Sequence, residues 1–288
     1  MKTIRLILMI LILSFGLFSF GFGKSKTTFK EALRDKKIEI KISSNGSYSG
    51  KCINIELKNL SRNKLNLEMI SGTLFVPDDS NEQTLVTPNH LLIAINRNEV
   101  KLIKIAAFCT EANDKSPSKN SKFTLSEIQN FKLLNLFQLL DSLKNIDNQN
   151  IQQAIWCITD NQSVSNIYCA DAYKSIALRK YLCSVTGQNE TWYNTKSEVS
   201  IDKYNHIVRT TKEINGIIEF ISSEAVELQG FVKDSLGNIV YKNPNKTLCP
   251  AGKIKLEFNV KVADWKEGKY DLVYTNNGKE LISKSFSF

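Results

Sequence analysis

The stretch Lys253-Ile-Lys-Leu-Glu-Phe-Asn-Val-Lys-Val262 decides the fold class, because apolar and polar residues alternate along its whole length. A period of two places the apolar side chains on one face of a strand and the lysines on the other. A sheet with one packed face and one wet face is typical of antiparallel β structure. The same alternation recurs on both sides of a helical middle section.

Residues 36–110 carry the alternation toward the N-terminus, in short runs separated by polar turns such as Ser43–Gly46 and Asn59–Asn63. About six short strands joined in this way indicate an antiparallel β-sandwich, with a generic likeness to immunoglobulin-like domains. The apolar positions that define these strands are Ile38, Ile40, Ile42, Ile53, Ile55, Leu57, Leu65, Leu67, Met69, Leu74–Val76, Leu91–Ile95 and Val100–Ile105.

The middle of the chain has a period of about 3.6 residues, which predicts helices. Residues 111–122 are polar and turn-rich, and Ser126-Glu127-Ile128-Gln129 is a capping-box pattern for the first helix. A second helix is expected from about Asn148 and a third from about Asp171 to Thr186, with Gly187 as its stop. Their apolar positions are Leu133, Leu136, Phe137 and Leu140, then Ile151, Ile155 and Ile158, then Tyr173, Ile176, Ala177 and Tyr181.

Residues 216–288 return to alternation and predict a second small β-sandwich. Asn276-Asn277-Gly278 is a hairpin signal, since Asn and Gly accept the positive φ angles of a tight turn. We therefore expect an α+β chain with an N-terminal antiparallel β-sandwich, a helical subdomain and a C-terminal immunoglobulin-like β-sandwich. The expected boundaries are 1–23 for a signal peptide, then 24–112, 113–200 and 201–288.

The first 23 residues have the pattern of a secretory signal peptide. Lys2 and Arg5 precede an uncharged apolar run from Leu6 to Phe22, which small residues close. An uncleaved N-terminal anchor is the alternative, because the run is just long enough to span a bilayer. We expect a secreted protein at the outer cell envelope or beyond, with no membrane span once the leader is removed.

The net charge of +9 falls to +7 without the two basic residues of the leader. The lysines are spread along strands, as in Lys101-Leu102-Ile103-Lys104-Ile105, and this spacing predicts wet strand faces. A nucleic-acid surface would cluster basic and aromatic residues, so no nucleic-acid partner is expected. An acidic polymer of the cell envelope remains a candidate weak partner.

All six cysteines follow the leader, at Cys52, Cys109, Cys157, Cys169, Cys183 and Cys249. An even count in an exported chain permits disulfides, while buried free thiols are the competing interpretation. Cys52 falls on the polar side of its strand pattern. No metal site and no cofactor are expected, since no CxxC occurs and His90 and His206 are the only histidines.

The C-terminal segment follows a pattern of turn glycines and core aromatics. Its elements are Phe231–Val240, Ala251–Lys253, Gly268–Leu272, and Gly278 with Lys284–Phe286. This pattern resembles the immunoglobulin-like C-terminal domains of secreted Bacteroidetes proteins, including type IX secretion sorting domains. The resemblance implies either an export address that is removed or, as we prefer, a retained stalk or spacer module.

The more specific segment is Ile151-Gln-Gln-Ala-Ile-Trp156, which resembles the TQxAIW motif of thioester-domain adhesins on bacterial surfaces. Upstream, Phe108-Cys109-Thr110-Glu111 is similar to the aromatic-Cys motif of that family. Leu228-Gln229-Gly230-Phe231-Val232 fits the third family motif. Ile151 and Thr110 depart from the family pattern.

This resemblance implies a thioester in which Cys109 supplies the sulfur and Gln229 or Gln152 the acyl group. The cysteine would displace ammonia from the glutamine amide, and an amine or hydroxyl of a partner would then attack the thioester. The competing interpretation is packing. Trp156 would then anchor a helix to a sheet, Gln152 would satisfy a backbone group and Cys109 would be a buried thiol.

Trp156, Trp192 and Tyr193 are candidate ligand-binding residues, because aromatic faces stack on sugars; packing is the alternative. No nucleophile motif occurs, so we expect no catalytic residues and no enzyme. The sequence favours a secreted or cell-surface binding or adhesion protein with an extracellular protein or polysaccharide ligand. The alternatives are a secreted hydrolase with scattered active-site residues and a structural part of a secretion machine. The sequence does not predict the oligomeric state.

Overall fold

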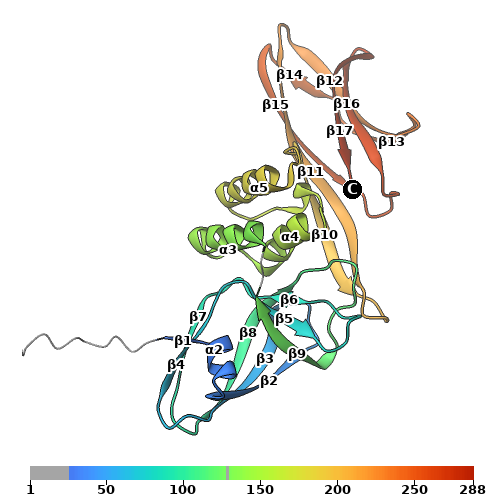
Figure 1. The fold of residues 1–288 in the computed structure, drawn as a ribbon. Coiled ribbons are helices and arrows are strands. Elements are labelled where there is room, and N and C mark those ends of the chain that lie inside the picture. Colours follow the sequence, from blue (N-terminus) through green and yellow to red (C-terminus); the bar gives the residue numbers. More distant parts are fainter. Residues whose placement is uncertain (1–25, 128–129) are drawn as a thin grey trace, which may run out of the picture.

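The computed structural model describes residues 26–127 and 130–288, so the predicted signal peptide lies outside the described residues. The fold is α+β and mostly β, with several separate sheets. Figure 1 shows a barrel at one end, helices in the middle and further sheets at the other end, which makes the described chain elongated. None of its described helices is long and apolar enough to cross a membrane.

The N-terminal strands close into a six-stranded barrel, whereas the sequence predicted an open sandwich. The order around the barrel is β2-β3-β8-β6-β5-β9. Closure removes the exposed strand edges that a sandwich would leave. The barrel strands are β2 (Ile38–Asn45), β3 (Ser49–Asn59), β5 (Thr73–Pro77), β6 (Leu85–Val86), β8 (Val100–Cys109) and β9 (Lys119–Glu127).

Strand β9 closes the barrel, and the sequence reading missed it. It pairs with β2 on one side and β5 on the other, although it lies beyond the boundary expected at residue 112. Ser126 and Glu127, expected to cap a helix, belong to this strand, and the rest of that pattern lies outside the described residues. The alternating Phe123 and Leu125, which turn toward the core, were the signal.

A short sheet β1-β4-β7 and a helix complete the N-terminal region. Helix α2 begins with a capping box between Thr28 and Glu31 and buries Phe29 and Ala32. The elements are β1 (Thr27–Thr28), α2 (Phe29–Arg34), β4 (Leu65–Met69) and β7 (Leu91–Ile95).

The three predicted helices are confirmed as α3 (Phe131–Leu143), α4 (Asn148–Thr159) and α5 (Ala172–Thr186), with the 3-10 turn η1 (Val164–Asn166) between the last two. Asn130 caps α3 by accepting from the Lys132 N–H. Gly187 ends α5 in the left-handed conformation. Their buried faces form one core with Phe108 of β8.

The buried face of α5 is not the one that the sequence indicated. Tyr173 and Ile176 are exposed, while Leu178, Arg179 and Leu182 are buried. Arg179 lies on the buried face although it is charged, so the apolar periodicity did not identify that face. Its carbon stem and hydrogen-bonded guanidinium fill a position that a hydrophobic residue would normally occupy.

The C-terminal region has a three-stranded sheet, β10-β11-β15, and a five-stranded sheet in which β13, β12, β16 and β17 follow in order and β14 pairs with β12. The two sheets share one core. Asn277 and Gly278 have positive φ in the β16–β17 hairpin, as predicted. The strands are β10 (Tyr193–Ile201), β11 (Ile207–Ser222), β12 (Val226–Asp234), β13 (Ile239–Lys242), β14 (Thr247–Cys249), β15 (Gly252–Lys261), β16 (Lys269–Asn276) and β17 (Lys279–Ser287).

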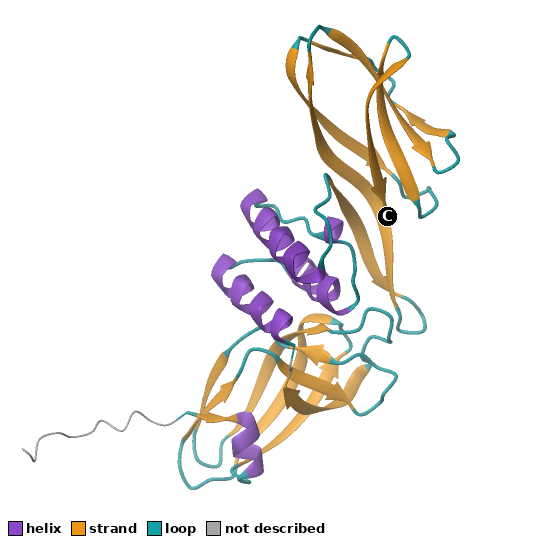
Figure 2. Ribbon diagram, turned by 45° about the horizontal axis from the view of Figure 1, so that its top comes forward, coloured by secondary structure: helices purple, strands orange, loops and turns teal. Residues whose placement is uncertain are grey.

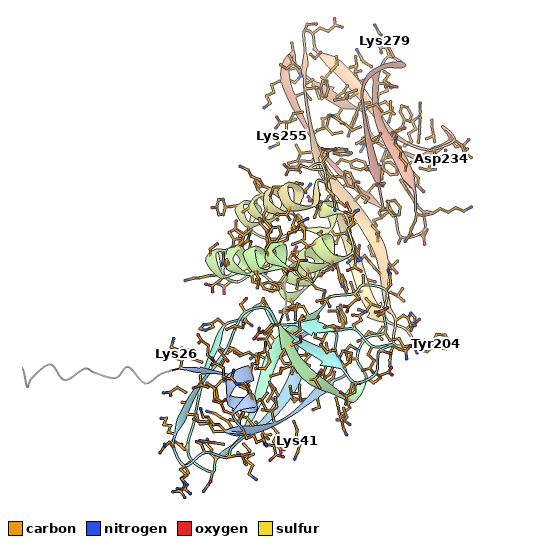
Figure 3. The ribbon with its side chains drawn as sticks, in the orientation of Figure 1. Lys26, Lys41, Tyr204, Asp234, Lys255 and Lys279 are labelled. Atoms are coloured by element: carbon orange, nitrogen blue, oxygen red, sulfur yellow. The ribbon has the colours of Figure 1, made fainter. Side chains whose placement is uncertain are left out.

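Strand β11 links the two ends of the molecule. It pairs with β15 through residues 213–222 and with β10 through residues 207–216, and the β10–β11 hairpin runs past the helices toward the barrel (Figure 2). Its tip, marked by Tyr204 in Figure 3, docks on the barrel, where the Ser116 N–H donates to the Asn205 carbonyl at 2.7 Å. A continuous strand therefore connects barrel and C-terminal sheets in place of a flexible linker.

All six cysteines are free thiols, and Cys183 alone is not fully buried. Cys52 lies in the barrel core rather than on the polar face that its pattern indicated. A register shift between Gly50 and Ile53 lets two successive residues of β3, Cys52 and Ile53, both face inward.

Candidate functional site

The structure brings Cys109 and Gln152 together at the junction between barrel and helices. Cys109 ends strand β8, and Gln152 lies in the first turns of α4. The Gln152 Oε1 accepts from the Cys109 N–H at 3.0 Å, and the Gln152 Nε2 donates to the Cys109 carbonyl at 2.8 Å. Because both residues are buried, this amide satisfies backbone groups that water does not reach.

The Cys109 thiol is held in its neutral form. Burial raises its pKa well above the ordinary value, and the neighbouring Cys52 and Glu111 act in the same direction. The thiolate is the reactive species, so a buried thiol of this kind is a weak nucleophile. The arrangement therefore holds an acyl group beside the cysteine while engaging that group in backbone hydrogen bonds.

Gln229, the other candidate acyl donor, is not near Cys109. It lies on β12 in the C-terminal sheets, at the opposite end of the molecule from β8 (Figure 1). Its Nε2 donates to the Asn243 carbonyl at 2.7 Å. The structure thus brings together two of the three motif segments.

Trp156 lies one helical turn after Gln152, on the same face of α4. Its ring is buried and stacks on that of Tyr48, with centroids 6.2 Å apart and an interplanar angle of 11°. The Arg209 guanidinium lies over the Trp156 ring, with its Cζ 5.7 Å from the centroid. This cation–π contact places a positive charge from β11 directly beside α4, the helix that carries the Ile151–Trp156 segment.

Arg209 is a largely buried cation with unused hydrogen-bond donors. Burial lowers its pKa to about 10, and the nearby Cys157 and Tyr48 act weakly against this shift. Its Nη2 is buried and has no hydrogen-bond partner among the described residues. A guanidinium has five N–H donors, and the two on Nη2 have no acceptor among the described residues.

The sequence reading missed Arg209 and Tyr48. Ile207, Arg209 and Thr211 share the less exposed face of β11, while Val208 and Thr210 face solvent. An arginine at a position where the alternation expects a core residue was the available signal. Tyr48 lies in a Gly- and Ser-rich turn and carried no such signal.

Trp192 and Tyr193 lie in a cluster filled by side chains. Their rings pack with Phe258 and Phe286, and Trp192 also covers Gly216 so closely that a Cβ there would lie 2.9 Å from its ring. The Trp192 Nε1 donates to the Ser285 carbonyl at 2.6 Å, and the Tyr193 hydroxyl donates to the Ser287 carbonyl at 3.1 Å. Their aromatic faces are used for packing within the core of the C-terminal sheets.

Three clefts open where the parts of the molecule meet. The first, of about 660 Å³, lies between barrel loops near His90 and the helices α3 and α4. The second, of about 570 Å³, lies between Tyr48, the start of α4 and the β10–β11 hairpin. The third, of about 340 Å³, contains Arg209 and lies between η1, the hairpin and the end of β17.

Comparison with known proteins adds little. No protein-family model matches the chain, and no curated protein matches it. A solved structure that is similar in part is the Se-Met labelled β-glucosidase from Kluyveromyces marxianus, with 7% sequence identity and a TM-score of 0.18. The alignment covers 82% of this chain and 44% of that chain, so this chain spans less than half of its length. A likeness this weak carries no argument about fold or function.

Proposed function

We propose that this chain is a non-enzymatic binding or adhesion module outside the cytoplasm, with an extracellular protein or polysaccharide as its ligand. The observation that carries the proposal is that three clefts lie where the barrel, the helices and the C-terminal sheets meet. Ligand sites occur preferentially at such junctions. The paired C-terminal sheets would form an immunoglobulin-like spacer that holds these clefts away from the cell.

A direct structural connection between the parts supports the same proposal. Strand β11 reaches from the C-terminal core to the barrel, and the hairpin tip is fixed there by Asn205. Clefts between parts that cannot move freely are pre-organised, which lowers the entropy lost on binding. A module of this design suits display of a preformed site on a surface.

The test uses biolayer interferometry to measure binding of the purified mature chain to panels of extracellular polysaccharides and proteins. We expect saturable binding that is reversed by soluble ligand and leaves the ligand chemically unchanged. Absence of saturable binding to every panel member would overturn the proposal. Cleavage of a bound polymer would instead identify the hydrolase that the sequence kept as an alternative.

A covalent adhesin is a second candidate, favoured by one specific observation: the Gln152 carboxamide lies on Cys109. In the reaction, the Cys109 sulfur bonds to the Gln152 Cδ, the C–N bond breaks, and ammonia leaves with the thiol proton. An amine of a partner then attacks Cδ and releases the thiol. The thioester would remove the Nε2 hydrogen bond to the Cys109 carbonyl, because that nitrogen leaves as ammonia, while Oε1 remains as the thioester oxygen.

Intact mass of the mature chain, denatured without reductant and with or without methylamine, decides between the two candidates. A thioester lowers the mass by one ammonia and is opened by methylamine, and Cys109→Ala abolishes both effects. Gln229→Ala is the matched control, because Gln229 lies far from Cys109. A mass that methylamine leaves unchanged removes the covalent candidate and leaves the non-covalent one.

A further inference from the structure

The cleft around Arg209 has the composition of a site for an acidic sugar. We propose that it binds a saccharide unit that carries a carboxylate, with Arg209 holding the carboxylate and the hydroxyl-bearing walls holding the sugar hydroxyls. This inference rests on the proposed function in one respect, because it names the ligand class of that binding module.

The charge of Arg209 supports an anionic ligand. Arg209 makes no ion pair within the described chain, its Nη2 has no hydrogen-bond partner, and its surroundings lower its pKa through burial. A buried charge is costly unless it is paired. An arginine fork recognises a planar carboxylate through two parallel hydrogen bonds, so a carboxylate ligand would use the free donors.

The walls of the cleft support a saccharide. Ser163 and Asn166 contribute from the η1 region, and Thr195 and Thr211 contribute from the hairpin. Thr195 donates to the Asn166 Oδ1 at 2.5 Å, which leaves the Asn166 amide N–H groups for a ligand. The volume of about 340 Å³ lies at the small end of ligand pockets, as suits one sugar unit.

Glu267 is the carboxylate on the wall of the cleft, and it belongs to no ion pair with Arg209. A carboxylate ligand would be repelled by it, so Glu267 limits affinity. The positive net charge, +9 for the full chain and +7 without Lys2 and Arg5, acts in the opposite direction and attracts acidic polymers from a distance.

The test is isothermal titration calorimetry of the mature chain with galacturonate, and with galactose as the neutral sugar of matched shape. We expect galacturonate to bind about tenfold more tightly than galactose, as a charge-assisted hydrogen-bonded pair requires. Arg209→Met should abolish this preference. Equal binding of both sugars by the wild-type chain, or a preference that survives in Arg209→Met, would overturn the inference.

Two further variants keep the test valid if Arg209→Met folds poorly. Thr211→Val removes one wall hydroxyl from the same strand and should weaken galacturonate several-fold. Glu267→Gln removes the repelling carboxylate and should strengthen galacturonate several-fold; weaker binding would instead show that Glu267 assists the site and contradict the inference. Sulfate serves as an oxyanion without sugar hydroxyls, and sulfate that competes as well as galacturonate would exclude a saccharide site.

Failure of this inference is distinguishable from failure of the proposed function. If Arg209→Met still binds the same polysaccharides or proteins as the wild-type chain, the Arg209 cleft is not the binding site and the module stands. If the wild-type chain binds no panel member but prefers galacturonate, the sugar site stands and the adhesion module fails.

Discussion

Two arginines at the contacts between the helices and the β10–β11 hairpin show how differently a desolvated cation is used. Arg179 of α5 donates to the Thr191 carbonyl at 2.5 Å, to the Asn194 side chain and to the Tyr193 carbonyl. Arg209 of β11 has no such partners and rests on Trp156. Both lose some of their basicity through burial, since burial lowers the pKa of each.

The difference separates a structural cation from a candidate binding cation. Arg179 donates to the loop that leads from α5 into β10, and the Glu190 carboxylate lies 3.9 Å from its Nε, so the fold supplies a counter-charge although Nε itself has no hydrogen bond. Arg209 lines a cleft, makes no ion pair among the described residues, and has a buried Nη2 without a hydrogen-bond acceptor. Desolvation without compensation destabilises the folded state, and it persists in proteins where a ligand provides the partner.

The largest expected effect is on the structural side of this comparison. Arg179→Met removes the partner of several buried acceptors, and each unsatisfied acceptor costs about 1–3 kcal/mol. We expect the free energy of unfolding to fall by about 3 kcal/mol or more, measured by urea denaturation. A loss below about 1 kcal/mol would show that the Arg179 network contributes little and would remove the contrast with Arg209.

The next effect concerns Gln152. Its side-chain amide hydrogen-bonds the buried backbone groups of Cys109, as Arg179 hydrogen-bonds the backbone of its loop. Gln152→Leu leaves the Cys109 carbonyl without its partner, and we expect a loss of about 2 kcal/mol in urea denaturation. The adjacent Gln153 is the matched control, since it is equally buried but its Oε1 has no partner. Gln153→Leu should change stability by less than about 1 kcal/mol, and equal losses in the two variants would refute the assignment.

A smaller effect is expected where Trp192 packs beside the Arg179 loop. A Cβ at Gly216 would lie 2.7 Å from the Trp192 carbonyl oxygen, so Gly216→Ala must displace this segment. Overpacking of this kind typically costs about 1–3 kcal/mol, and we expect about 1 kcal/mol in thermal or urea unfolding. Gly268→Ala, at a position with open space, should be near neutral. A neutral Gly216→Ala would mean that Trp192 is free to move and has room for a ligand.

The smallest effect contrasts the pKa of the buried Cys52 thiol with that of the partly buried Arg209. Burial raises the pKa of Cys52 from 9.0 to about 12, so above pH 9 the unfolded chain loses this proton while the folded chain keeps it. Stability therefore falls as pH rises in that window. Arg209, with its pKa lowered to about 10, acts in the opposite direction at higher pH, because the folded chain then releases its proton first.

The pH dependence is tested with Cys52→Ala, which removes the contribution of this thiol to the pH dependence of the free energy of unfolding. Between pH of about 8 and about 10, the stability difference between wild type and variant should shift by about 1 kcal/mol in favour of the variant. A difference that does not change with pH would show that the Cys52 thiol ionises in the folded chain as it does in the unfolded chain.

Much of the secondary structure follows from local pattern. The alternation in residues 253–262 and the 3.6-residue period after Phe131 predicted a strand and a helix that the structure contains. Barrel closure was not predictable in this way, because it depends on β9 pairing with β2 and β5 across the chain. Local periodicity carries no information about which strands meet.

The candidate site was predicted only in part, for a similar reason. The motif resemblance singled out Cys109, Gln152 and Trp156, which the structure gathers at one junction. Arg209 comes from a strand about fifty residues further along. Its proposed role follows from the absence of a counter-charge and of a hydrogen-bond acceptor for its Nη2. The absence of a counter-charge is a property of the folded chain, so no sequence motif records it.

Urea denaturation of Arg209→Met, without added ligand, tests the central claim most directly. If Arg209 serves a ligand and not the fold, an apolar side chain of similar length relieves the desolvation cost, and the variant should be as stable as wild type or more stable. A loss comparable to that of Arg179→Met would show that Arg209 is a structural residue and would contradict the account.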